Sequence, residues 1–271
     1  MNIQIQIIKK SSLFAIISSF IIGCSPDTKQ TVITKTKLVM QEEFDTNGAP
    51  NPSMWSYNIG TGTNGWGNNE LQYYTARPEN VVVENGNLKI TARQELYLGS
   101  SYTSARILTK GKFEQKYGRI EARIKLPLGK GLWPAFWMLG ANSDTVLWPQ
   151  CGEIDIMEYL GDKPTQVLGS VHGPGYSGGS AVSTKFTLKN DRFDTDYHIF
   201  GIEWGENYIN YYVDDVLYNQ ITPADVSGEW VFNQPFYIIL NVAVGGNLPG
   251  TPNSETVFPQ TMLVDYVRVY E

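Results

Sequence analysis

The chain has 271 residues, of which 42% are hydrophobic and 13% aromatic, and it carries a formal net charge of −6 at pH 7. This length is enough for a hydrophobic core in one or two domains. The acidic balance, without any run of Lys or Arg, argues against a nucleic-acid-binding surface, which needs a basic face. An uncharged ligand is compatible with this balance.

The N-terminal segment has the pattern of a targeting signal rather than of a folded element. Lys9 and Lys10 form a basic start, and residues 13–22 follow as an apolar run. A basic region followed by a short apolar region is typical of a secretory signal peptide. The run is too short to span a bilayer as a helix.

The apolar run ends in Ile-Ile-Gly-Cys, with the cysteine at position 24. This ending resembles a bacterial lipobox, although an ordinary signal peptide followed by a chance cysteine remains the alternative. We therefore predict a lipoprotein signal peptide over residues 1–23, a lipid on Cys24 and a polar tether over residues 24–37. The predicted location is the bacterial cell envelope, as an outer-membrane lipoprotein that contacts the membrane through its lipid only.

The chain contains two cysteines, Cys24 and Cys151. If Cys24 carries a lipid, then Cys151 has no partner and no disulfide forms. Its apolar strand-like surroundings predict a small buried side chain rather than a reactive thiol.

After the tether, short strand-like runs recur between Gly, Asn and Pro residues, and helical periodicity is nearly absent. In the run at 118–126, Ile120 and Ile124 face one way, whereas Arg119 and Glu121 face the other. The residues at 84–86 and 213–215 predict hairpin turns. The predicted strands cover residues 80–84, 87–92, 118–126, 135–139, 152–159, 165–172, 197–204, 208–213, 236–244 and 262–270. This pattern predicts one all-β sandwich domain over residues 38–271.

Three carboxylates lie inside the apolar run GEIDIMEYLG: Glu153, Asp155 and Glu158. Side chains alternate across a strand, so the first two share a face and the third should point to the opposite face. One extra residue, a β-bulge near Ile156 and Met157, would bring Glu158 back to the same face. Two carboxylates on one face suit glycoside hydrolysis, in which one attacks the anomeric carbon and the other protonates the leaving oxygen.

This run resembles the active-site signature of glycoside hydrolase family 16, in its bulged form E-x-D-x-x-E. The resemblance implies a retaining endo-hydrolase on a β-sandwich jelly roll of two packed antiparallel sheets with a concave substrate cleft. It implies Glu153 as the nucleophile, Glu158 as the acid/base and Asp155 as their helper, with no cofactor for catalysis. It continues through WGNNELQYYT, GLWPAFWMLG, GSVHGPGYSGG, YHIFGIEWGENYINYYVDD and ILNVAVGGNLPG, and so covers nearly all of the chain after the tether.

Within the family, the set is most similar to bacterial laminarinase-like β-1,3(4)-glucanases, which predicts a β-1,3-glucan or mixed-linkage β-1,3-1,4-glucan as substrate and a monomer. One departure is Leu248, where such enzymes often have Trp. Two alternatives remain: a relative that cleaves an algal galactan, and a glucan-binding lectin without activity. All three acids are present, which disfavours the lectin.

Several residues are candidates for substrate binding. Trp133 and Trp137 lie four apart, so that a strand presents both on one face, where aromatic rings can pack on sugar rings. Core packing and ordinary loop chemistry are the competing interpretations. The remaining candidates are Trp148, His172, Asn64, Arg106 and Asn241, with Asn68 and Glu70 in the same Gly-rich loop as Asn64. The second histidine, His198, is predicted to be a core or edge residue.

The resemblance also implies a structural calcium away from the cleft. The matching positions are Glu42 or Glu43, the carbonyl of Gly86, and Asp265. Their donors are all oxygens, which Ca²⁺ prefers. The sequence alone identifies the acids only as surface residues.

Overall fold

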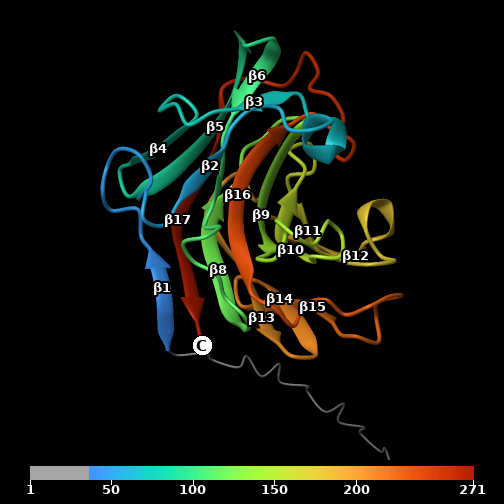
Figure 1. Cartoon of the computed structure of the whole chain (residues 1–271). Coiled ribbons are helices and arrows are strands. Elements are labelled where there is room, and N and C mark those ends of the chain that lie inside the picture. The colour runs from blue at the N-terminus through green and yellow to red at the C-terminus, as the bar shows by residue number, and fades with distance from the viewer. Residues whose placement is uncertain (1–36) are drawn as a thin grey trace, which may run out of the picture. The chain divides into compact units, whose positions relative to one another are not determined.

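Two β-sheets pack face to face in the computed structural model, which describes residues 37–271 (Figure 1). The predicted signal peptide, Cys24 and the tether up to residue 36 lie outside the described residues. The predicted all-β sandwich is therefore confirmed. No helix within residues 37–271 is long and apolar enough to cross a membrane.

The seven-stranded sheet is called the cleft sheet here because its strands line the cavity described below. Its strands in spatial order are β12 (Val182–Thr187), β11 (Gln166–His172), β10 (Glu153–Tyr159), β9 (Leu132–Gly140), β16 (Phe236–Val244), β7 (Arg106–Leu108) and β2 (Ser56–Asn58). All neighbouring pairs in it are antiparallel.

The ten-stranded sheet is called the back sheet. Its main path is β15 (Val216–Ile221), β14 (Tyr208–Val213), β13 (His198–Gly205), β8 (Gly118–Lys125), β17 (Gln260–Tyr270), β5 (Asn87–Tyr97), β6 (Ser100–Ser104) and β3 (Gln72–Tyr74). Beside this path, β1 (Leu38–Glu42) pairs with β17, and β4 (Val81–Glu84) pairs with β5. The β3–β6 pair is parallel, which departs from the predicted antiparallel pattern.

The hydrophobic core fills the space between the two sheets. It includes Trp204 and Phe200 from β13, Phe236 from β16 and Ile154 from β10, all at most 1% exposed. Burial of such side chains contributes about 2 kcal/mol each, which makes this layer the main source of stability. Cys151 is also buried and free, as predicted.

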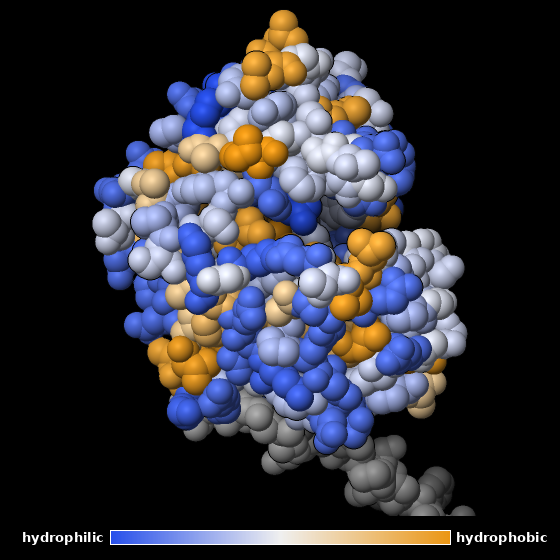
Figure 2. All heavy atoms as spheres, viewed as in Figure 1, coloured by the Kyte–Doolittle hydropathy of each residue, from blue (hydrophilic) through white to orange (hydrophobic). Residues whose placement is uncertain are grey.

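Every predicted strand corresponds to a strand of the structure, and both predicted hairpins are confirmed. In the first turn Asn85 and Gly86 have φ of 56° and 71°, and in the second Asp214 and Asp215 have φ of 49° and 62°. Two successive positive φ values match the right-handed twist of the flanking strands. Another hairpin, β5–β6, projects at the top of the view in Figure 2, where its exposed Leu96 and Leu98 form an apolar tip.

The alternation in β8 is also confirmed, but its polar face is less exposed than polar side chains on a sheet usually are. Ile120 and Ile124 point into the core, whereas Arg119 and Glu121 point away from it. Both polar residues are nevertheless buried, because they belong to a cluster of ion pairs on the outside of the back sheet. His198 is likewise buried at the start of β13, and its Nδ1 lies 2.7 Å from Asp214 Oδ2.

Candidate active site

Strand β10 contains the bulge that the spacing of its acids predicts. Against β9, Asp155 pairs with Trp137 and Met157 pairs with Phe136, so Ile156 is the extra residue. Against β11, Asp155 pairs with Ser170 and Glu158 pairs with Leu168. Two residues of β10 therefore face one residue of β11, which restores the third acid to the face of the first two.

The residue of β11 opposite the bulge is Gly169, and the space there explains why it is glycine. A Cβ at this position would lie 2.3 Å from Tyr218 Oη and 2.5 Å from a ring carbon of Tyr211. Any larger residue would push these two aromatic rings away from the cleft sheet. The bulge thus depends on close contact between β11 and the back sheet.

A cavity of about 1320 Å³ extends over the cleft sheet, from the loop before β3 to the edge strand β12. All three acids line it, whereas Ile154, Ile156, Met157 and Tyr159 of the same strand face the core. The cavity also contains every predicted substrate-binding residue, namely Asn64, Arg106, Trp133, Trp137, Trp148, His172 and Asn241, together with Asn68, Glu70 and Leu248.

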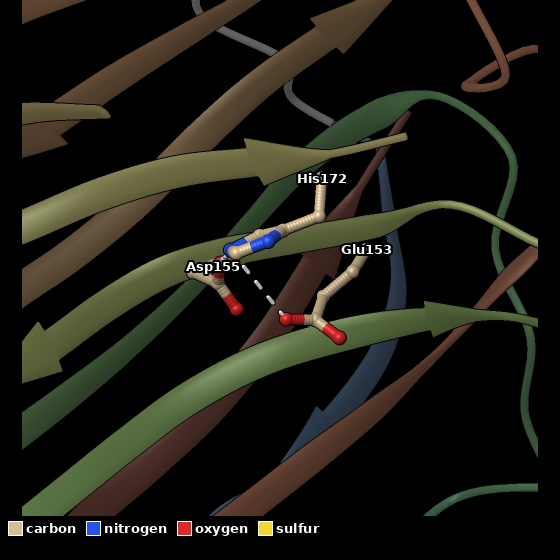
Figure 3. A group of neighbouring side chains, drawn as sticks. All are labelled: Glu153, Asp155 and His172. Carbon is tan, nitrogen blue, oxygen red and sulfur yellow. Dashed lines mark ion pairs between the residues drawn. The ribbon is translucent and has the colours of Figure 1, made fainter. Parts of the chain in front are cut away.

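At one end of the acid row, Glu153, Asp155 and His172 turn toward one another (Figure 3). Antiparallel pairing places His172 directly opposite Glu153. Its Nε2 lies 3.0 Å from Asp155 Oδ2 and 3.7 Å from Glu153 Oε1. The Asp155 side chain is almost completely buried, and its Oδ2 has no hydrogen-bond partner among the described residues. Within residues 37–271, these three residues are also the one cluster with the geometry to hold a metal ion.

At the other end of the row, Glu158 is held by two hydrogen-bond donors. Trp133 Nε1 donates to its Oε1 at 3.1 Å, and Ser170 Oγ donates to its Oε2 at 3.4 Å. Ser170 is itself fixed, because Ser183 Oγ donates to its hydroxyl and Tyr211 Oη donates to its carbonyl. The carboxyl group of Glu158 is therefore oriented from two neighbouring strands.

The three acids are held in environments that favour their protonated forms. Burial, followed by repulsion from Asp155, raises the pKa of Glu153 and of Glu158 to about 8. Burial likewise raises the pKa of Asp155 to about 8. Repulsion among the three groups means that one of them can lose its proton while the others keep theirs. The shifts mean that the site retains protons near neutral pH, where isolated carboxyls would lose them.

On the β7 side of the acids, Arg106 is sandwiched between two tryptophan rings. Its guanidinium carbon lies 4.8 Å from the ring centre of Trp66 and 4.7 Å from that of Trp137. Trp137 Nε1 also donates to Asn241 Oδ1 at 2.7 Å. Such stacking fixes the orientation of a guanidinium while its nitrogens remain available for hydrogen bonds.

The loop that contributes Trp66 is built around Glu70. Burial raises the pKa of Glu70, and hydrogen bonds from Gln72 at 2.7 Å and Asn68 at 3.3 Å partly offset this. Asn64 and Trp66 both have positive φ in this loop, at 49° and 56°. The strained backbone indicates that the loop is held in shape by these contacts.

The predicted calcium residues lie outside the cavity, on strands β1 and β17 of the back sheet and in the β4–β5 turn. β17 leaves β5 after the Val264–Leu88 pair and joins β1 at the Val267–Glu42 pair, which brings Asp265 between Glu42 and the Gly86 turn. Their donors are oxygens, which fits Ca²⁺. Asp265 also pairs with Arg123 at 2.7 Å, so that a cation there would share its carboxylate. Of the two alternatives left open by the sequence, Glu43 pairs with Arg268, which leaves Glu42.

Several residues of the cavity were not predicted from the sequence. Trp66 and Ser170 contact predicted site residues directly, and Lys163 and Lys185 line the end of the cavity near β12. Ser170 could have been found from its place two residues before His172 on the same face of β11. Nothing in the local sequence around Trp66 shows that it stacks on a residue 40 positions later.

The family pattern of Glycosyl hydrolases family 16 matches residues 68–268. The β-glucanase of Rhodothermus marinus is 42% identical over 268 residues, covering 94% of this chain and 93% of that protein. An endo-1,3-1,4-β-glycanase of Rhizobium meliloti is 31% identical, covering 85% of this chain and 49% of that protein. The structure of the catalytic domain of an endo-1,3-β-glucanase (laminarinase) from Thermotoga petrophila superposes with a TM-score of 0.83. It is 51% identical and covers 87% of this chain and 97% of that one.

The matched region contains the bulged strand, the three acids and the cavity-lining Trp133, Trp137 and Trp148. The two sheets are those of a jelly roll, as in the superposed laminarinase domain. On this evidence the chain belongs to glycosyl hydrolase family 16 and is a glycoside hydrolase.

Proposed function

We propose that the protein is a retaining endo-hydrolase of β-1,3-glucan, of mixed-linkage β-1,3-1,4-glucan, or of both. The observation that carries this proposal is the row of three acids that the β10 bulge turns to one face of an open cavity. The substrates in the names of the relatives support the choice of glucan. The aromatic and amide side chains around the acids suit neutral sugar rings.

The proposed mechanism is a double displacement. Glu153 attacks the anomeric carbon as its glycosidic bond breaks, and Glu158 gives its proton to the leaving oxygen. The product of this step is a glycosyl ester on Glu153 and an ionised Glu158. Glu158 then takes a proton from water, whose oxygen attacks the anomeric carbon and releases Glu153 as a carboxylate. The raised pKa of Glu158 suits its role as the first proton donor.

The contacts of the acids suit these two roles. Trp133 and Ser170 orient the Glu158 carboxyl toward the leaving oxygen. Asp155 lies between the two glutamates in the row, and its repulsion contributes to the raised pKa of Glu153, which lets it adjust the charge of the nucleophile. A sugar ring that stacks on Trp133 and Trp137 would lie over this row of acids. Hydrogen bonds to its hydroxyl groups would come from Arg106, Asn64 and Asn241.

Reducing-end assays on laminarin, barley glucan, agarose and carrageenan test the substrate class. We expect new reducing ends from the first two and none from the last two, with NMR showing the β-anomer as the first product. Cleavage of agarose or carrageenan alone would identify a galactan-cleaving relative instead. Binding of laminarin without any cleavage would identify a glucan-binding protein.

We further propose that the protein is a monomer attached to the cell envelope by a lipid on Cys24. The sequence pattern before Cys24 supports this, and the polar segment after it would let the domain reach a polymer. Replacing Cys24 by Ala should move the protein from the membrane pellet to the soluble fraction. A Cys24→Ala variant that remained in the pellet after signal cleavage would refute the anchor.

We also propose a structural calcium held by Glu42, the Gly86 carbonyl and Asp265. When bound, the ion would tie β1 and the β4–β5 turn to β17, and it would take no part in the reaction. The strand register, which sets Asp265 two residues from the partner of Glu42 and beside the β4–β5 turn, supports the site.

A further inference from the structure

His172 carries its proton on Nε2, because a backbone amide occupies the other ring nitrogen. The N–H of Gly178 donates to His172 Nδ1 at 3.0 Å. A ring nitrogen that accepts a hydrogen bond has no proton, and a neutral imidazole has one proton to place. The loop that carries Gly178 therefore fixes the tautomer of His172 as a donor at Nε2.

The Nε2–H of His172 faces a carboxyl oxygen of Asp155 that has no hydrogen-bond partner. Asp155 Oδ2 is buried without a hydrogen-bond partner, and His172 Nε2 lies 3.0 Å from it. An unpartnered buried acceptor is costly, so it gains from any donor within reach. The present alignment falls short of a hydrogen bond, and such contacts at active sites often tighten only when the substrate binds. Packing of the His172 ring against Trp148, with ring centres 5.9 Å apart, limits where Nε2 can point.

We propose that His172 is a positioning residue whose Nε2–H donates to Asp155 Oδ2 when substrate binds, so that any proton on Asp155 occupies Oδ1. This inference rests on the proposed roles of Glu153 and Asp155. Since Oδ2 faces a donor, a proton shared by Asp155 and Glu153 lies between Asp155 Oδ1 and the carboxyl of Glu153. The donation stabilises the one negative charge of this pair, and Glu153 carries that charge when Oδ1 holds the shared proton.

The same tautomer argues against a metal ion at these residues. The donor atoms of Glu153, Asp155 and His172 all lie within 4.8 Å of one another, as in a metal site. A metal would need the lone pair of Nε2, and the ring proton would move to Nδ1. Two N–H groups, those of Nδ1 and Gly178, would then face each other at 3.0 Å.

The tautomer can be measured directly by ¹⁵N NMR, because the chain has only two histidines. In a His198→Gln variant, His172 is the one histidine left to give signals. We expect Nδ1 to be unprotonated and Nε2 to be protonated, and a protonated Nδ1 would overturn the inference. Addition of Zn²⁺ should leave the His172 signals in place, whereas stoichiometric coordination at Nε2 would overturn it too.

The kinetic test compares His172→Leu with His172→Gln, since Gln offers both an acceptor for Gly178 and a donor for Asp155. Loss of the donor should destabilise the negative charge shared by Asp155 and Glu153. In the Leu variant we therefore expect kcat to fall about tenfold and the acid limb of its pH profile to move up by about one unit. KM should change less than kcat, and the Gln variant should recover most of both effects.

The other charged groups near Glu153, namely Glu158 and Arg106, are the same in both variants. An equal loss in both without any shift of the limb, or a loss confined to KM, would overturn the positioning role. A wild-type protein that cleaves no glucan would refute the proposed function instead, and the NMR result does not depend on that outcome.

Discussion

Each sheet of this protein buries a cluster of carboxylates, and the two clusters differ in their counter-charge. On the back sheet, Arg119 Nε lies 2.6 Å from Glu121 Oε2, and the same guanidinium pairs with Asp215 and lies 3.9 Å from Glu203. Tyr212 Oη donates to Glu203 at 2.8 Å. On the cleft sheet no Lys or Arg forms an ion pair with Glu153, Asp155 or Glu158 among residues 37–271.

The protonation of the two clusters follows from this difference. Burial would lower the pKa of Arg119, but its bonds to Glu121 and Asp215 outweigh burial and raise that pKa instead. The cleft acids lack such a partner, and burial raises their pKa values. Arg119 of the back cluster is thus held in its charged form, whereas the cleft cluster can gain and lose protons, as catalysis requires.

The largest expected effect comes from removing a cleft acid. Glu153→Ala and Glu158→Ala should each lower kcat/KM by about 10⁴-fold, since each removes a reacting group. Stability should be equal or higher, because an unpaired buried carboxyl is lost. Activity and melting temperature of the purified variants check both points, and activity within tenfold of the parent would refute the assignment.

Deleting Met157 should have the next largest effect, because it removes the bulge. The deletion leaves a regular strand in which Glu158 and Tyr159 keep their faces, but the core loses the buried side chain of Met157. We expect a loss of about 4 kcal/mol in the free energy of unfolding, measured in urea, from the space that this side chain leaves. Met157→Leu, which keeps the bulge and fills the core, is the control. A deletion variant as stable as the parent would contradict the place of Met157 in the core.

Breaking the back cluster should affect stability and spare the chemistry. Arg119→Gln leaves Glu203 and Glu121 buried without a counter-ion, and we expect a loss of about 3 kcal/mol in the free energy of unfolding. The kcat of the folded variant should stay within about twofold of the parent, since Arg119 lies outside the cavity. If kcat fell with stability unchanged, the division of roles between the two clusters would be wrong.

The pH dependence of activity should report the cleft cluster. The pKa of Glu158 is raised to about 8, so it is protonated at neutral pH and loses its proton above that value. We expect kcat to fall about tenfold per pH unit above about pH 8, because the proton donor is lost. A kcat that already declined as the pH rose from 5 to 6 would contradict the raised pKa of this group.

The raised pKa of Glu158 also makes the free energy of unfolding depend on pH. The folded pKa lies above the unfolded value, so the folded state holds protons that the unfolded chain releases. Stability from this source is complete below about pH 4 and declines as pH rises toward about 8. The Glu158→Gln variant should show a flatter dependence of unfolding free energy on pH than the parent.

Chelation should give the smallest effect. If calcium is bound near Asp265, excess EDTA should lower the melting temperature by a few degrees, because the ion binds only the folded state. The pH profile of kcat should not move, since the proposed ion site lies in the back sheet. A melting curve unchanged in EDTA and in added Ca²⁺ would remove the calcium proposal.

Strong alternation and turn residues predicted the strands β4, β5, β8 to β11, β13, β14, β16 and β17. The strands missed are short or polar, such as β12, with the sequence VSTKFT, and β15, with VLYNQI. Their place is decided by pairing with neighbouring strands rather than by their own pattern. The burial of Arg119 was not predictable either, because it depends on Glu203 and Asp215, which are distant in sequence.

The acid row of the site was predictable because its spacing conflicts with a regular strand, and one bulge resolves that conflict. The partners that orient the row were less predictable. The donation from Gly178 to His172 requires the 173–178 loop to fold back over β11, which no local pattern shows. Likewise, Trp66 meets Arg106 only because its loop and β7 meet at one end of the cavity.

The pairing of β1 with β17 brings residues 37 and 271 together at the edge of the domain (Figure 1). Glu271 N donates to Lys37 O at 2.9 Å, and Lys37 N donates to Glu271 O at 3.3 Å. A short linker could therefore join these two residues, and new ends could be opened at the exposed β5–β6 turn, between Leu98 and Gly99. Such a circular permutant should fold with its cavity intact, since none of these four residues lines it.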